Sequence, residues 1–182
     1  MRAVVRLMSV LAGLGDAPCA GSVQVVCVRT ATKEKVVNGI ETLASAFGPK
    51  ETMDRLEAAT RSKGMTVFAR IDHAAGAASV GLVLRPTELL IFGNAKAGTP
   101  LMQVNQAIGL DLPLRALVWQ DAAGVTFLSF DDPRWIVSRH EEDVALAGIA
   151  SEMARGLMAV TKAATQHPET YSHESRNGAD HE

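Results

Sequence analysis

Asp72 and His73 stand next to each other, directly after a run of residues typical of a β-strand, 66–71. An imidazole titrates near neutral pH and a carboxylate can orient it, so this pair has the chemistry of a general base. Neighbouring side chains on an extended chain point in opposite directions, however. Two interpretations therefore stay open: an acid–base pair, or Asp72 as the cap of a following helix with His73 hydrogen-bonded to backbone.

The segment 92–99 joins a predicted strand to a predicted helix. Gly93, Gly98, Lys96 and a helix N-terminus capped by Thr99 can together hold an anion through backbone N–H groups and the helix dipole. The order of residues differs from the phosphate-binding loop G-x-x-x-x-G-K-[ST]. The other interpretation is a turn that needs glycine for its backbone angles.

The candidate ligand-binding residues all lie at strand ends or in the loops that follow, where side chains and backbone N–H groups are available to a ligand. If a site exists, we expect one concavity lined by Asp72, His73, Arg85, Asn94, Lys96 and Thr99. Its cations suit a small anionic or polar-headed ligand. No nucleophile motif and no metal-ligand spacing is recognisable, so the sequence predicts no catalytic residue, no metal and no cofactor.

Composition narrows the possible partners. The chain has 182 residues, is 47% hydrophobic and carries a net charge of −2. Specific binding to a DNA duplex needs an excess of basic residues, so nucleic acid is not an expected partner. No apolar run approaches the ~20 residues of a membrane-spanning helix, so no membrane partner is expected.

Apolar periodicity and turn residues predict alternating strands and helices. Strands are expected over 40–46, 66–71, 89–92, 114–120 and 125–130, and helices over 50–63, 74–82, 99–108, 133–139 and 143–165. A short loop ending at Gly124 joins the last two strands, which is typical of a hairpin. Hairpin strands are antiparallel, so the sequence predicts an α+β fold rather than a doubly wound sheet.

The two ends of the chain differ from its middle. Residues 1–36 form an atypical segment in which Arg2 and Arg6 precede a short uncharged run, and they include Cys19 and Cys27. The expected location is cytoplasmic. The alternative is the periplasm or the outside of the cell, if residues 1–20, whose order resembles a secretory signal, are a signal peptide. A single domain is predicted over 37–165 and a disordered polar tail over 166–182.

Short strings of residues between Phe68 and Pro133 carry a family resemblance. They are Ile71-Asp72-His73, Arg85-Pro86-Thr87-Glu88, Phe92 to Met102, Asp111-Leu112-Pro113-Leu114 and Asp131-Asp132-Pro133. Together they resemble the family called domain of unknown function 302, over about residues 39–139. The family typically has proline where this chain has Ala95, which weakens a rigid anion cradle at that loop.

The resemblance implies a compact α+β fold, with helices packed on a mainly antiparallel sheet of about four to five strands, as in the TATA-box-binding-protein-like group. That grouping concerns shape and implies nothing about DNA. The resemblance to the family also implies a homodimer. The family itself has no assigned function. The absence of a convergent catalytic motif favours a non-enzymatic module that binds a small ligand or a protein. The alternative is an enzyme that acts on a small anionic substrate through Asp72 and His73.

Overall fold

The structure analysed is a computed structural model that describes residues 39–140 and 144–167. The chain divides into two units, 1–31 and 32–182, and all described residues belong to the second. The signal-like segment with both cysteines, and residues 168–182 of the polar tail, lie outside the described residues. None of the helices in the described part combines the length and apolar character needed to cross a bilayer.

The described elements alternate along the chain much as the sequence predicts. They are β1 (Ile40–Ala44), α1 (Pro49–Ser62), β2 (Thr66–Asp72), α2 (His73–Ser79), β3 (Thr87–Gly93), α3 (Ala95–Val104), the 3₁₀ helix η1 (Gln106–Leu110), β4 (Leu114–Gln120), β5 (Thr126–Asp131), α4 (Pro133–Ser138) and α5 (Val144–Thr165). The strands form one five-stranded sheet in the order β1-β5-β4-β3-β2. Every pairing is antiparallel, which confirms the α+β class.

The β4–β5 hairpin shows how local chemistry sets the register of the sheet. Gly124 has a φ of +82°, a left-handed conformation that glycine adopts without strain. The carboxylate of Asp121 accepts hydrogen bonds from the backbone N–H groups of Ala123 and Val125, both at 2.9 Å. Because hydrogen bonds inside the turn fix its conformation, the turn also fixes the pairing of Trp119 with Phe127.

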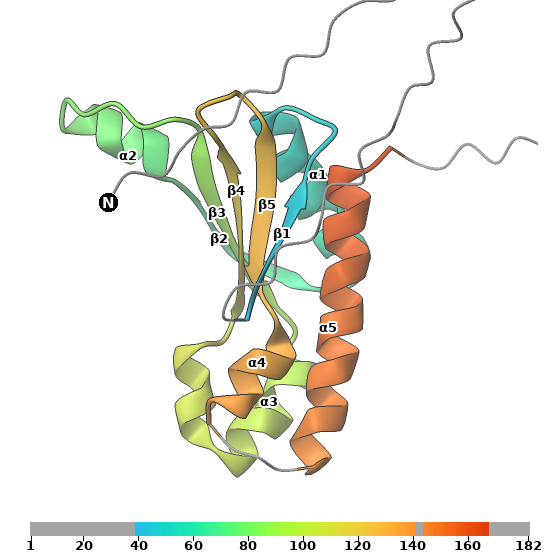
Figure 1. Ribbon diagram of the computed structural model, residues 1–182. Coiled ribbons are helices and arrows are strands. Elements are labelled where there is room, and N and C mark those ends of the chain that lie inside the picture. The colour runs from blue at the N-terminus through green and yellow to red at the C-terminus, as the bar shows by residue number, and fades with distance from the viewer. Residues whose placement is uncertain (1–38, 141–143, 168–182) are drawn as a thin grey trace, which may run out of the picture. The chain divides into compact units, whose positions relative to one another are not determined.

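Helices α1 and α5 cover one face of the sheet, to the right of the strands in Figure 1, whereas α2 lies to their left. Side chains on this covered face form rows across the strands, and the register aligns Val118 with Leu128 and Leu43. Leu56 of α1 and Leu157 of α5 are buried against the same cluster. At about 25 cal/mol per Å² of buried apolar surface, this layer is the main stabilising contribution to the fold.

The other face of the sheet, here named the open face, also carries large apolar side chains. The register places on it Ile71, Leu89, Ile91, Leu117, Trp119 and Phe127, all of them partly or well exposed. A sheet face that meets only water is typically polar, because side chains alternate between an apolar and a solvated side. The open face therefore has the composition of a surface that something else covers.

Polar groups on the open face are bonded to one another. The indole N–H of Trp119 donates to the hydroxyl of Ser129 at 2.9 Å, and that hydroxyl lies 2.9 Å from the hydroxyl of Thr42. The guanidinium of Arg115 donates to the carboxylate of Asp131 at 3.3 Å. Hydrogen bonds within the face reduce the cost of removing these groups from water if the face is covered.

Arg70 on β2 is the centre of an ion-pair cluster that ties α1 to the edge of the sheet. Its guanidinium donates to Asp54 at 2.7 Å and to Glu57 at 3.2 Å on α1, and it pairs with Glu88 on β3 through two hydrogen bonds. Glu88, followed by Asp54 and Glu57, raises the pKa of Arg70. Arg70 therefore stays charged, and the cluster responds to pH through its carboxylates.

The two carboxylates on α1 have lowered pKa values. Hydrogen bonds from Lys50 and then Arg70 lower the pKa of Asp54, and hydrogen bonds from Arg61 and then Arg70 lower that of Glu57. A carboxyl with a lower pKa in the folded state binds fewer protons than in the unfolded chain. Its stabilising effect is therefore present above the unfolded pKa and is lost as the pH falls through the folded pKa.

We predict that the protein loses stability as the pH falls below the ordinary values of these groups, 3.8 for Asp54 and 4.5 for Glu57. The Arg70→Gln variant should lose less stability on acidification, because Asp54 and Glu57 in this variant titrate closer to their ordinary values. Urea unfolding at steps between about pH 6 and pH 3 measures the difference. Arg155→Gln, which removes an exposed pair elsewhere, should keep the wild-type profile; equal profiles for all three proteins would contradict the assignment.

Candidate functional site

The structure separates the six predicted site residues into two groups. Asp72 pairs with Glu88 and Thr66 pairs with Gly93 in the β2–β3 ladder. The two ends of this ladder lie about 17 Å apart, since a strand rises about 3.4 Å per residue. The group at one end is Asp72, His73 and Arg85, and the group at the other end is Asn94, Lys96 and Thr99. The expected single concavity is therefore not formed.

Asp72 has a structural role that accounts for its position. Its side chain caps α2, where the carboxylate accepts a hydrogen bond from the backbone N–H of Ala75 at 2.8 Å. His73 is the exposed first residue of that helix, and no hydrogen bond joins its ring to the other described residues. Arg85 donates from Nε to the carbonyl of Gln120 at 3.0 Å. At this end of the sheet, Asp72 thus caps a helix and Arg85 binds the backbone at the end of β4.

Helix α3 begins earlier than the sequence indicates. Its N-cap is Asn94, whose side chain accepts a hydrogen bond from the backbone N–H of Lys96 at 2.9 Å, and Thr99 lies inside the helix. Asparagine is as good a cap as threonine, and the earlier cap prevails because the residues at 95–97, two alanines and a lysine, favour a helix. Neither Gly93 nor Gly98 has a positive φ, so no glycine-dependent turn and no separate anion loop form here.

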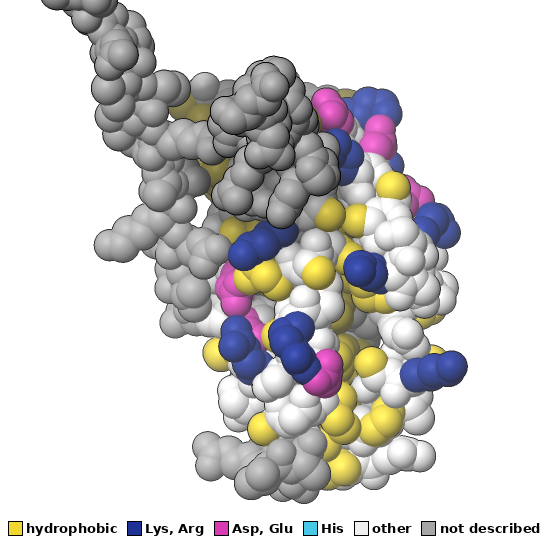
Figure 2. Space-filling view, turned by 90° about the vertical axis from the view of Figure 1, so that its right-hand side faces the viewer, with side chains coloured by type: hydrophobic (Ala, Val, Ile, Leu, Met, Phe, Trp, Pro, Cys, Tyr) yellow, Lys and Arg dark blue, Asp and Glu magenta, His cyan; other side chains and the backbone are white. Residues whose placement is uncertain are grey.

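An apolar cleft of about 880 Å³ lies beside the first turns of α3. Four parts of the chain wall it: the start of β2, α3, the segment 112–114 and the middle of α5. The lining residues are Lys63, Met65, Phe68, Gly93, Asn94, Ala95, Ala97, Gly98, Thr99, Met102, Leu112, Pro113, Leu114, Ile149, Glu152, Met153, Gly156 and Leu157. Figure 2 shows hydrophobic side chains gathered in the lower half of the face that α5 borders.

Glycines shape both the floor and the mouth of the apolar cleft. A Cβ at Gly93 would lie 3.3 Å from Pro113 and 3.7 Å from Phe68, which is tighter than ordinary contact on the Pro113 side. The missing side chain lets β3 and the segment 112–114 approach each other closely. A Cβ at Gly156 would meet no atom within 4 Å, so this helical glycine borders open space at the cleft.

Of the predicted residues, Asn94 and Thr99 line the cleft, whereas Asp72, His73, Arg85 and Lys96 do not. Sequence reasoning missed the remaining walls, above all the contribution of α5. The apolar stripe of α5 is visible in the sequence, but a stripe alone does not distinguish residues packed in the core from residues that border a cleft. The three cleft methionines, Met65, Met102 and Met153, were the available signal, because methionine is common on adaptable binding surfaces.

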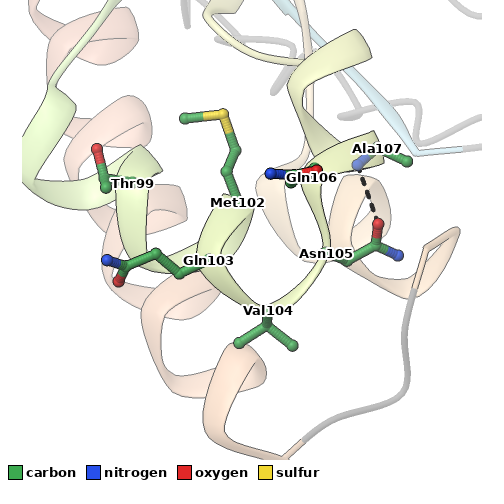
Figure 3. A pocket seen from close by; sticks show the side chains of 7 residues that line it. All are labelled: Thr99, Met102, Gln103, Val104, Asn105, Gln106 and Ala107. Atoms are coloured by element: carbon green, nitrogen blue, oxygen red, sulfur yellow. Dashed lines mark hydrogen bonds between the residues drawn. The ribbon is translucent and has the colours of Figure 1, made fainter.

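A second depression lies between the end of α3 and η1. It is lined by Thr99, Met102, Gln103, Val104, Asn105, Gln106 and Ala107. In Figure 3 the side chains of Gln103, Val104 and Asn105 point in different directions. The side-chain oxygen of Asn105 accepts a hydrogen bond from the backbone N–H of Ala107. Because these side chains do not converge on a common point, the depression is a weaker candidate than the apolar cleft.

Asp111 forms an ion-pair cluster directly before the cleft residues 112–114. Its largely buried carboxylate lies 2.6 Å from Nε2 of His140 and accepts a hydrogen bond from Arg139 at 3.3 Å. Arg115 lies 4.0 Å away. The cluster joins the start of the cleft wall to the end of α4. Asp111 and His140 are 29 residues apart, so local sequence patterns do not predict this pair. Among the described residues, no three His, Cys, Asp or Glu side chains gather as a metal site.

The comparison with protein families agrees with the sequence strings and the fold. A family model described as "Domain of unknown function DUF302" matches residues 41–164, which is more than half of the chain. The chain belongs to the DUF302 family. The match runs from β1 to the end of α5, so it includes all four walls of the apolar cleft.

The relatives of this DUF302 domain include longer proteins with a named activity. The "Fluoride-specific ion channel FluC 1" of Brucella suis biovar 1 (strain 1330) is 46% identical over 125 residues, which are 69% of this chain and 49% of that protein. "Fluoride-specific ion channel FluC 2" of Brucella melitensis biotype 1 matches at 46% identity, over 69% of this chain and 46% of that protein. The chain thus spans about half the length of these relatives.

A solved structure confirms the fold of the DUF302 domain. The crystal structure of an uncharacterised conserved DUF302 protein from Bacillus stearothermophilus superimposes with a TM-score of 0.63 at 24% identity. The match covers 69% of this chain and 98% of that chain. At this identity the likeness establishes the fold and leaves the activity open.

We predict that Asp111→Asn lowers the free energy of unfolding by about 2 kcal/mol, because charge-assisted hydrogen bonds to a largely buried carboxylate are lost. His140→Gln should lower it by less, since Arg139 still pairs with Asp111. Urea denaturation measures both values. Lys50→Gln removes an exposed i,i+4 pair with Asp54 and should change stability by less than about 0.5 kcal/mol. An Asp111→Asn variant as stable as the Lys50→Gln control would show that the cluster is not structural.

Proposed function

We propose that this DUF302 domain is a non-enzymatic module that binds a small ligand in the apolar cleft. The observation that carries the proposal is the cleft itself: about 880 Å³ lined mainly by apolar side chains, with a few polar groups at Asn94, Thr99, Lys63 and Glu152. Ligand sites in proteins typically occupy about 300–1,000 Å³ and combine apolar walls with few, well-placed polar groups. A ligand with an apolar body and a polar or anionic head suits this arrangement.

No observation favours the alternative of an enzyme that uses Asp72 and His73. A general base must lie within hydrogen-bonding reach of its substrate and be oriented by its partner. The carboxylate of Asp72 caps α2, and both residues lie at the opposite end of the β2–β3 ladder from the cleft. Their positions are explained by the start of a helix.

We also propose that two copies of the domain associate through an apolar surface made of the open face and an arm, residues 73–86. The arm comprises α2 and the segment that leads to β3, and it lies on the side of the sheet away from α1 and α5 (Figure 1). Large side chains are exposed along it: Val80 by 70%, Leu82 by 66% and Val83 by 101%. The arm has no acidic residue.

A second copy suits this surface because a two-fold interface joins each patch to its equivalent, so the arm of one copy can cover the open face of the other. Contiguous exposed apolar surface of this kind marks interaction sites in soluble proteins. The mutual hydrogen bonds on the open face, such as Trp119 to Ser129, keep its polar atoms satisfied when water is removed.

The relationship to the fluoride channels concerns only part of those proteins. We propose that the activity in their names belongs to the half that this chain does not match, since the described residues contain no helix able to cross a bilayer. Two domains on one polypeptide are held at high effective concentration, so ligand binding by a DUF302 domain can act on its neighbour without a separate encounter.

Gly156→Leu tests the ligand-binding proposal. The new side chain should fill the mouth of the cleft and weaken binding of the neutral fluorescent probe N-phenyl-1-naphthylamine by about tenfold or more, the equivalent of about 1.4 kcal/mol. Folding should not suffer, because leucine in a helix is about 0.8 kcal/mol more favourable than glycine. Fluorescence titration and thermal melting measure the two effects.

Gly148→Leu is the matched control, because Gly148 also lies on α5 with no atom within 4 Å of a new Cβ, and it does not line the cleft. It should gain similar stability and keep wild-type probe binding. If Gly156→Leu binds the probe as the control does, the cleft is not the binding site.

Val83→Asp tests the association of two copies. A charge at this fully exposed arm position should convert a dimer to a monomer, because the buried surface would then hold an unpaired carboxylate. Analytical ultracentrifugation measures the mass. Leu110→Asp is the control, since Leu110 is 84% exposed on η1, away from the arm. A monomeric wild type, or a Val83→Asp variant that stays dimeric, would contradict the proposed surface.

A further inference from the structure

We infer that the ligand of the apolar cleft is a single-chain amphiphile with a carboxylate head, held at Lys63. The inference rests on the proposed binding function and adds the chemical class of the ligand and its orientation. Two features of the cleft point to this class: walls that adapt to a flexible chain, and one cation at the rim that has no acidic partner among the described residues.

The walls of the cleft suit a flexible chain better than a rigid ring system. Met65, Met102 and Met153 come from three separate parts of the fold and meet at the cleft. Methionine is unbranched and has three rotatable bonds, so such a lining can close around a chain in more than one conformation. Phe68 is the one aromatic residue of the lining. A single ring offers no stacking sandwich for a flat ligand.

Lys63 supplies the charge at the rim. It is the C-cap residue of α1 and lines the cleft, and no acidic side chain within 39–140 or 144–167 forms an ion pair with it. Glu152, the acidic residue of the lining, pairs with Arg155 on its own helix. The rim therefore offers one uncompensated positive charge, which matches one carboxylate.

Neutral donors also line the cleft at exposed positions. The side-chain oxygen of Asn94 is used to cap α3, which leaves its amide NH₂ group as a donor, and Thr99 adds a hydroxyl. A carboxylate accepts such hydrogen bonds without needing a second cation. A nucleotide or other polyphosphate requires several cations or a cradle of backbone N–H groups, and the lining of this cleft has one lysine and no arginine.

The experiment compares two ligands that share a chain and differ in the head. Sodium dodecanoate and 1-dodecanol are titrated at pH 8 against the full-length chain loaded with N-phenyl-1-naphthylamine. Dodecanoate should displace the probe at an about tenfold lower concentration than dodecanol, as expected for a charge-assisted contact. In Lys63→Gln this preference should disappear while binding of the probe stays unchanged.

Lys162→Gln is the charge-matched control, because Lys162 is exposed on α5 and does not line the cleft. It should keep the preference for dodecanoate. Probe binding without any preference for dodecanoate overturns this inference and leaves the proposed function standing, and so does an equal loss in both lysine variants. A chain that binds neither the probe nor dodecanoate overturns the proposed function and this inference together.

Discussion

The burial of one sheet face under α1 and α5 is the constraint on which the rest of the domain depends. Rows such as Val118, Leu128 and Leu43 are continuous only in one register, because a slip by one residue would turn every side chain to the other face. The same burial fixes the height of α5 along the sheet. Since α5 extends past the strands, its lower half becomes a wall of the apolar cleft (Figure 1). The core thus determines the geometry of the candidate site.

Ion pairs attach the periphery to this core. Arg70 joins α1 to β2 and β3 at one edge of the sheet, and Asp111 joins the entrance of β4 to the end of α4. Charged clusters of this kind contribute less free energy than apolar burial, but their geometry is directional. They add orientation to segments that also bury apolar side chains. Leu114 of the wall at 112–114 is a core residue, and the Asp111 cluster directly before it helps to position the cleft.

The proposed functions use apolar surfaces that the core leaves exposed. The apolar cleft, the open face and the arm all expose side chains that a domain could otherwise bury, and each suits a partner of different size. The DUF302 match and the solved relative establish the family and the fold. The longer relatives add that such a domain occurs in proteins named as fluoride channels, over about half of their length. The proposal of a binding module rests on the cleft and the exposed apolar surfaces, not on these comparisons.

The sequence by itself determined the local elements and the class of the fold. Turn residues such as Gly124, and apolar periodicity such as that of α5, act over a few residues, so strand and helix positions were predicted to within a few residues. Only the tertiary structure decided which side chains meet. An antiparallel ladder moved Asp72 away from Lys96, and Asn94 took the cap predicted for Thr99. The pairing of Asp111 with His140 and the walls of the cleft depend on contacts between distant segments, which local patterns do not encode.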